Sequence, residues 1–346
     1  MGTRTYNEVL EYLDSTDRDI HLLLGNGFSM AYDPDIFSYN ALHKFIEQID
    51  DELLSKLFDI VNTKDFELVM QQLDNFNELI ELFGSDKKLK THTTRAIQRL
   101  QESLLEAIQD LHPEHVFKIS EDESKSAADF LSFYTNHNGN VFTTNYDLLL
   151  YWVLMRNSIA NSTDGFGRDL LNPEDEYIPE DELEYSKLRW GKNKENQNIH
   201  YVHGTLPFFD TGIHIEKEEY TTTRYLLENV KARLDRKEYP IFVTAGSGKE
   251  KLTHILHNRY LTYCYESLCN ISGSLVTFGF NFGENDKHII DAINKASKQG
   301  KQVPPRLWSV YIGTYSDEDR RHIESIREDF KCKVTIWDAK TAKVWR

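Results

Sequence analysis

The chain has 346 residues and a mass of 40.5 kDa, enough to bury a substantial core in one or two domains. Its net charge of −16 argues against nonspecific binding to nucleic acid or to an anionic membrane surface. Cys264, Cys269 and Cys332 have the spacing of neither a disulfide framework nor a structural zinc site. No apolar run approaches the roughly 20 residues that span a bilayer, so we expect a cytoplasmic protein.

Strand-like and helical segments alternate along the chain. An amphipathic helix at 4–14 precedes an apolar strand that ends at Gly25, and apolar residues at three- and four-residue spacing then predict helices from about 40 to 112. Residues 157–198 are rich in Asn, Asp and Glu and are predicted to be irregular. Further strands are predicted within 140–147, 198–206, 238–246, 273–280, 306–316 and 332–339.

This order predicts a single α/β domain over residues 1–346. Its expected fold is a Rossmann-like parallel sheet with helices on both faces. A helical insertion is expected at about 40–125 and an irregular insertion at about 157–198. We find no internal repeat and no low-complexity tract.

Polar residues collect at the carboxyl ends of the predicted strands. The groups are Gly25-Asn26-Gly27, Thr144-Asn145 with Asp147, His203-Gly204, and Gly279 through Asp286. In an open parallel sheet these ends share one edge, and ligands bind in the crevice there. The sequence therefore predicts that residues far apart in the chain form one site.

Each motif also has a structural interpretation. Gly25 and Gly27 lack the third glycine of a dinucleotide-binding turn, so they are also consistent with a simple strand-to-helix turn. Asn145 or Asp147 is a candidate cap for the helix that follows, and Asn285 or Asp286 for the next one. His203 fits a hydrogen-bonded histidine at a strand end. The combination, more than any single motif, indicates function.

In chain order the motifs GNGFS, TTNYD, HG and GFNFGEND resemble those of the sirtuin superfamily. The resemblance is closest to bacterial sirtuin-like domains, including a family of unknown function, and it spans about residues 20–340. Asn26, Thr144 and Asn281 depart from the residues usual in sirtuins, and the zinc cysteines are missing. These departures weaken the case for protein deacylation, whereas the motifs that the resemblance associates with NAD cleavage are still present.

The resemblance implies a role for each matching residue. Asn145 would contact the nicotinamide ribose, Asp147 would face the nicotinamide, and His203 would be the general base. The cofactor-binding residues would be Gly25, Asn26, Gly27, Phe28, Ser29, Phe37, Thr144, Gly279, Phe280, Asn281 and Asp286.

The function implied is an NAD+ glycohydrolase that releases nicotinamide and ADP-ribose, or a cyclised form, with NAD+ as substrate and no metal. Such bacterial domains often act in anti-phage defence by depleting NAD+, which implies control by homo-oligomerisation or by a partner protein of the defence system. The alternatives are a sensor that binds NAD+ or ADP-ribose without turnover and an NAD-dependent protein deacylase. A base and an oriented water favour hydrolysis over binding alone.

Overall fold

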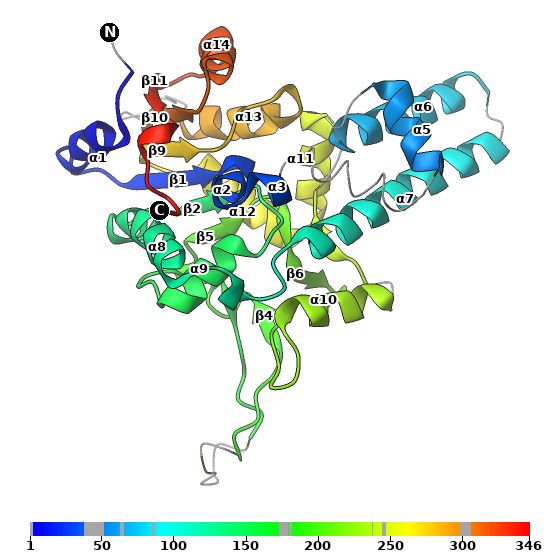
Figure 1. Ribbon diagram of the computed structural model, residues 1–346, viewed down its shortest axis with the longest axis horizontal. Helices are drawn as coiled ribbons and strands as arrows, with labels where there is room; N and C mark the ends of the chain where they lie inside the picture. The colour runs from blue at the N-terminus through cyan, green and yellow to red at the C-terminus, as the bar shows by residue number, and fades with distance from the viewer. Residues whose placement is uncertain are drawn as a thin grey trace.

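The computed structural model describes residues 3–37, 52–62, 66–84, 87–172, 179, 182–236, 238–243, 247–297 and 306–346. Its centre is a six-stranded sheet in the order β11-β10-β9-β1-β2-β5 (Figure 1). Every neighbouring pair in this sheet is parallel. The predicted Rossmann-like parallel sheet is confirmed. Its strands are β1 (Ile20–Leu24), β2 (Val141–Thr143), β5 (Ile199–Tyr201), β9 (Gly273–Phe278), β10 (Leu307–Thr314) and β11 (Lys333–Asp338).

The central strands are buried along their whole length. All residues of β1 and β9 are buried, as expected where helices cover both faces of a parallel sheet. The helices of the main body are α1 (Tyr6–Asp14), α2 (Asn26–Tyr32), α3 (Pro34–Phe37), α8 (Glu121–Asn136), α9 (Leu149–Asn157), α10 (Leu226–Asp235), α11 (Gly248–His257), α12 (Arg259–Cys269), α13 (Lys287–Ala296) and α14 (Asp317–Ser325). Short 3-10 turns are η1 (Val116–Lys118), η3 (Lys194–Asn196), η4 (Glu284–Asp286), η5 (Arg327–Asp329) and η6 (Ala339–Thr341).

Three helices project from one side of the body (Figure 1). They are α5 (Glu52–Val61), α6 (Phe66–Leu82) and α7 (Lys87–Leu111). Their apolar faces form a small core of their own, which includes Phe58, Met70 and Leu100 and is separate from the main core. Helices thus occupy most of the described part of the segment expected to be a helical insertion; residues 112–120 are turns, and the first residues, 40–51, lie outside the described residues.

A second sheet is antiparallel and has the order β3-β4-β7-β6-β8. Its strands are β3 (Phe166–Gly167), β4 (Leu188–Trp190), β6 (Gly204–Asp210), β7 (Ile215–Lys217) and β8 (Pro240–Phe242). The segment expected to be irregular, 157–198, supplies β3 and β4. Four of its five strands have only two or three residues, too short to carry a recognisable alternation of polar and apolar residues, and the strand predicted within 238–246 is β8 of this sheet rather than a parallel strand.

Among the described residues no helix is both long enough and apolar enough to cross a membrane.

Candidate functional site

The register of the parallel sheet brings the polar turns to one edge. Leu24 lies beside Thr143 and Phe278, and Thr143 lies beside Tyr201. The residues just beyond these positions are Gly25, Thr144, Val202 and Gly279, so all four turns leave the sheet at its carboxyl edge. The predicted convergence of these motifs at the carboxyl edge is confirmed.

The first glycine turn packs directly against the fourth. The Gly27 N–H donates to the Gly279 carbonyl over 2.9 Å, and the Gly25 N–H donates to Phe278 over 3.0 Å. A Cβ on Gly25 would lie 2.5 Å from the Gly279 oxygen, and one on Gly27 would lie 2.4 Å from the Gly279 Cα. Gly279 itself has a φ of +68°, a conformation that glycine adopts readily. The glycines of this strand-to-helix turn are therefore required by the close approach of two backbones.

Phe28 and Ser29 lie beneath this turn. Both side chains are fully buried, and the Phe28 ring packs 5.0 Å from the ring of Trp345, whose indole N–H donates to the Phe28 carbonyl over 2.9 Å. The Phe28 N–H donates to Gly25. Asn26 is the exposed residue of the turn, and its side-chain amide donates to the Phe37 carbonyl over 3.0 Å. Among the cofactor-binding residues predicted at 25–29, Asn26 is therefore the most accessible.

Asn145, Ser29 and Asp147 form a buried hydrogen-bonded cluster, which we call the polar clamp. Asn145 Nδ2 donates to the Gly25 carbonyl over 3.0 Å and to Ser29 Oγ over 2.9 Å. Ser29 Oγ donates in turn to Asp147 Oδ2 over 2.5 Å. Among the described residues none donates to Asn145 Oδ1. The clamp fixes the Asn145 amide and leaves its oxygen as the group that can meet a ligand.

Asp147 also lies just before helix α9, whose N-cap residue is Leu148. Neither candidate cap therefore occupies the N-cap position, but Asp147 Oδ1 accepts the Leu149 N–H of the first turn over 2.9 Å. Both carboxylate oxygens of Asp147 therefore have protein donors. Thr144 is likewise bound to the neighbouring strand, because its N–H donates to the Leu24 carbonyl over 3.1 Å.

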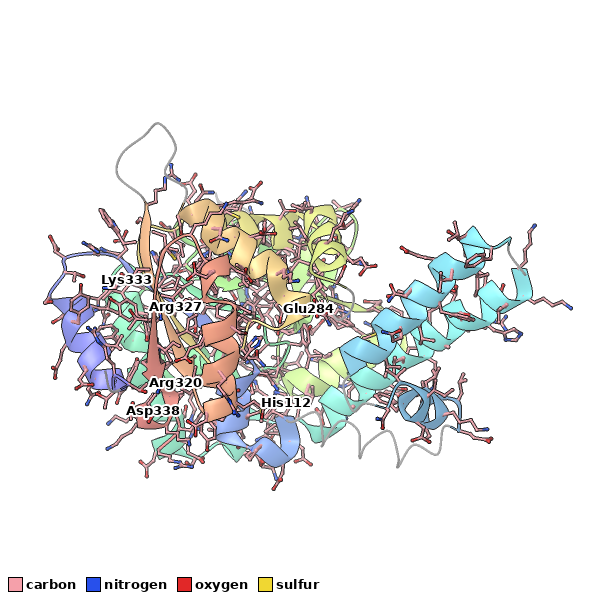
Figure 2. All side chains as sticks on the ribbon, turned by 90° about the horizontal axis from the view of Figure 1, so that it is seen from above. His112, Glu284, Arg320, Arg327, Lys333 and Asp338 are labelled. Atoms are coloured by element: carbon pink, nitrogen blue, oxygen red, sulfur yellow. The ribbon has the colours of Figure 1, made fainter. Side chains whose placement is uncertain are left out.

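His112 supports the same turn from the base of the helical projection (Figure 2). Its Nε2 accepts the Leu148 N–H over 3.0 Å, and its Nδ1 lies 3.0 Å from the Pro113 carbonyl. Burial lowers the pKa of His112, while the nearby Asp147 carboxylate acts in the opposite direction. A neutral ring is the form that can accept the Leu148 N–H. The Phe37 ring packs edge-on to His112, with 5.7 Å between the ring centres.

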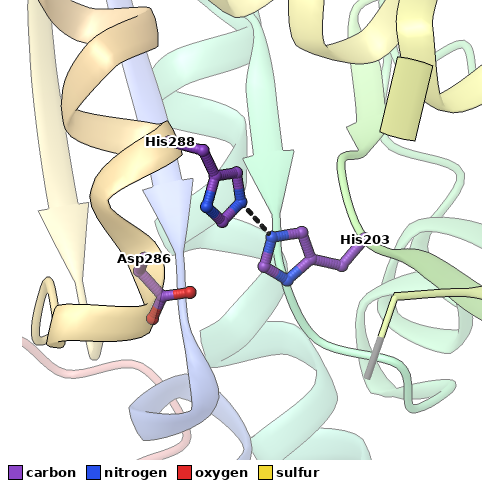
Figure 3. A group of neighbouring side chains, drawn as sticks. All are labelled: His203, Asp286 and His288. Carbon is purple, nitrogen blue, oxygen red and sulfur yellow. Dashed lines mark hydrogen bonds between the residues drawn. The ribbon is translucent and has the colours of Figure 1, made fainter. Parts of the chain in front are cut away.

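His203 lies at the same sheet edge and is paired with a second histidine (Figure 3). Its Nε2 is 2.8 Å from the Nε2 of His288, at the start of α13, and both rings are buried. Burial, His288 and the charge of Lys251 hold the pKa of His203 well below its usual range. Burial and Lys251 lower the pKa of His288 to about 3. Both rings are therefore neutral near pH 7.

Asp286 belongs to this histidine group and also stands at the N-cap position of α13. Of the two candidate caps, Asn285 and Asp286, it is therefore Asp286 that occupies the cap, but its side chain makes no capping bond; its Oδ1 instead accepts from Lys251 Nζ over 3.1 Å. His203, Asp286 and His288 offer ligand atoms within 4.8 Å of one another, which is a possible metal-binding set. The Lys251 ammonium on Asp286 opposes a dication at this place.

The last predicted residues follow β9. Phe280 is buried and packs edge-on to Phe282, with 4.7 Å between the ring centres, whereas Asn281 is exposed. Sequence reasoning missed His112, Lys251, His288 and Trp345, which hold the predicted residues in place. The only sequence signal was the position of His288, at the start of the helix that follows the GFNFGEND turn.

No curated protein matches the chain. One family model, described as Domain of unknown function (DUF4917), matches residues 22–345, a span that contains every motif at the sheet edge. The chain therefore belongs to the DUF4917 family.

Proposed function

We propose that the protein is an NAD+ glycohydrolase that cleaves the bond between nicotinamide and ribose. The observation that carries the proposal is the state of two side chains at the sheet edge. Asn145 has both amide N–H groups bound by the protein and Oδ1 left for a ligand. His203 is held through Nε2, and its Nδ1 edge turns away from His288 (Figure 3).

These two groups suit the chemistry of the reaction. Loss of nicotinamide leaves an electron-poor ribose carbon, as in other glycosidic cleavages, and a water molecule must attack it. Asn145 Oδ1 would accept a hydrogen bond from that water or from a ribose hydroxyl. His203 Nδ1 would accept the proton of the water, which requires a neutral ring; the lowered pKa keeps the ring neutral and also makes it a weaker base, so it needs help with the proton.

The remaining clamp residues would act through Asn145. Asp147 has protein donors on both oxygens, so in this proposal it holds Ser29 and the start of α9 in place of contacting the nicotinamide. The pyrophosphate would lie over the Asn26 turn, beside the exposed Asn281. Neither residue is charged, and an acidic protein can hold a dinucleotide through backbone and amide donors.

The motif resemblance to bacterial sirtuin-like domains supports the same reaction and adds a cellular role. We propose that the activity serves anti-phage defence by depleting NAD+, under the control of self-association or a partner protein. Expression in a bacterial host, with NAD+ measured before and after phage infection, tests this role. NAD+ that stays constant in infected cells would contradict it.

The direct test is to incubate the purified protein with NAD+ and follow free nicotinamide by chromatography. Asn145→Ala is the inactive comparison, and Asn270→Ala, at the exposed end of α12, is the matched control. Release of nicotinamide by the parent and the control alone supports the proposal. Calorimetric binding of NAD+ without release would instead indicate a sensor, and release only in the presence of an acetyl-lysine peptide would indicate a deacylase.

A further inference from the structure

The two buried histidines face each other through the same ring atom. The Nε2 atoms are 2.8 Å apart, and the ring planes differ by 25° (Figure 3). An N–H bond and an imidazole lone pair both lie in the plane of the ring, so this edge-to-edge contact fits a single N–H···N hydrogen bond. One ring must donate and the other must accept.

The charged and titratable groups around the pair come from α11, η4, α12 and the turn after β2, where the Tyr146 ring stacks on His203 with 6.5 Å between the ring centres. Burial lowers both histidine pKa values, the positive charge of Lys251 on α11 lowers them further, and Asp286 of η4 holds the Lys251 ammonium group. The Tyr265 hydroxyl of α12 donates to the His288 backbone carbonyl over 3.2 Å. Among the described residues none bonds to His288 Nδ1, which is buried. Within this shell the Asp286 carboxylate, whose oxygen lies within 4.8 Å of the ligand nitrogens of both histidines, favours a positive charge on His288, and Lys251 opposes it.

The direction of the hydrogen bond decides what His203 can do. A neutral imidazole carries one proton. If His203 donates through Nε2, its Nδ1 has a free lone pair and can act as a base. If His288 donates, the proton of His203 is on Nδ1, and that atom cannot accept another.

We propose that His288 is the positioning residue that keeps His203 in its basic tautomer and receives its displaced proton. The inference rests on the proposed function. When His203 Nδ1 takes a proton from the attacking water, the proton on His203 Nε2 passes to His288 Nε2. His288 is then an imidazolium and His203 is neutral. At the end of the cycle the Nδ1 proton leaves His203 for solvent, and the shared proton returns from His288 to His203 Nε2.

The surroundings fit a short-lived charge on His288. Lys251 disfavours the imidazolium, so His288 keeps the extra proton only while His203 carries the proton of the water on Nδ1. A cavity of about 450 Å³ lies against the starts of α11 and α13, and Ser247, Lys287 and His288 line it. The cavity gives a small buffer molecule such as imidazole a way to reach this position.

Nitrogen-15 NMR of the histidine rings tests the inference without any turnover. Spectra of the parent, assigned with His203→Gln and His288→Gln, report which nitrogens carry protons. The expected result is a proton on Nε2 of His203 and on Nδ1 of His288. The opposite tautomers would overturn the proposal.

Turnover of His288 variants gives the second readout. His288→Gln keeps an acceptor oxygen but cannot take the proton, so nicotinamide release should fall roughly tenfold to a hundredfold. Since the pKa of His203 is lowered in part by His288, the acid limb of the pH profile should move to higher pH. Imidazole should partly restore His288→Ala. The matched control is His254→Gln, an exposed histidine of α11, which should keep parental turnover.

The outcomes separate this inference from the proposed function. Full turnover and an unchanged pH profile in folded His288→Gln would reduce His288 to a packing residue and overturn the inference. A parent that never releases nicotinamide would overturn the proposed function, and the tautomer spectrum would still decide the direction of the hydrogen bond.

Discussion

The polar clamp and the histidine pair lie at the same sheet edge and are built in opposite ways. In the clamp, Ser29, Asn145 and Asp147 exchange short hydrogen bonds and also bind backbone groups of two turns. In the pair, His203 and His288 share one hydrogen bond, and buried His288 Nδ1 has no partner among the described residues.

This difference predicts different roles: the clamp holds the turns in place, and the histidine pair can exchange a proton. A buried polar group with all of its partners is rigid, and removing one partner costs roughly 1–3 kcal/mol. Two neutral imidazoles beside the Lys251 cation are poised differently, because one proton can move along their shared axis without any backbone change. The clamp should therefore respond to mutation, and the pair should respond to pH as well.

The largest expected effect is that of Asn145→Ala. If Oδ1 orients the water or a ribose hydroxyl, nicotinamide release should fall by about two orders of magnitude or more. The change also removes both donors to Gly25 and Ser29, so the free energy of unfolding should fall by roughly 1–3 kcal/mol. Chromatography of nicotinamide and urea unfolding measure the two effects. A folded variant with parental turnover would remove Asn145 from the site.

His203→Ala should reduce release to a similar extent. The two losses should be non-additive in the double variant, because residues that act on one step fail together. The same chromatographic assay, at substrate concentrations above and below the parental KM, checks this. Losses that multiply would mean that Asn145 and His203 act on different steps.

Acid should weaken the fold through the buried histidines. The pKa of His288 is lowered to about 3, and that of His203 is also lowered, whereas in the unfolded chain both are near 6.5. Below about pH 6.5 the unfolded chain binds more protons than the folded protein, so the free energy of unfolding decreases as the pH is lowered. Each histidine should remove roughly 2 kcal/mol between pH 7.5 and 5.

Urea unfolding at several pH values checks this effect. His21 and His200 are buried as well, with pKa values lowered to about 4 and about 3, so they contribute to the same slope. Replacing both members of the pair by Gln should flatten the slope by about 1.4 kcal/mol per pH unit for each histidine removed. An unchanged slope would mean that the pair is protonated in the folded protein.

Ser29→Ala sharpens the comparison by removing two hydrogen bonds of the clamp, the one from Asn145 to Ser29 and the one from Ser29 to Asp147. The Asn145 amide keeps its bond to Gly25, and its Oδ1 stays in place. We therefore expect a loss of roughly 1–3 kcal/mol in the free energy of unfolding, with turnover within a few-fold of the parent. Thermal unfolding and the nicotinamide assay, run on the same samples, separate the effects. A collapse of turnover without a loss of stability would place Ser29 against the substrate.

The sequence was enough to predict the carboxyl edge of the sheet as the site, but not the residues that hold this site in place. Strand periodicity and the polar residues after Leu24, Thr143 and Phe278 were enough to predict the parallel sheet and the convergence of its turns. The short strands of the antiparallel sheet carried no period, and nothing marked His112 or Lys251, because their roles arise from contacts between distant segments. Gly25 and Gly27 were interpreted as part of a ligand-binding turn, while the structure shows that the close approach of Gly279 already requires them.

The smallest expected effect is that of a chelator. His203, Asp286 and His288 have the chemistry of a metal site, yet Lys251 Nζ lies 3.1 Å from Asp286 Oδ1 and places a positive charge beside it. A metal on the histidine nitrogens would also replace the N–H···N hydrogen bond of the pair. We therefore expect NAD+ binding and nicotinamide release to survive treatment with EDTA and removal of the complex by gel filtration. Calorimetry and chromatography on the treated protein check this, with untreated protein as the reference. Loss of binding that zinc or magnesium restores would mean that the group works as a metal centre, and the histidine pair would then be two ligands rather than a proton path.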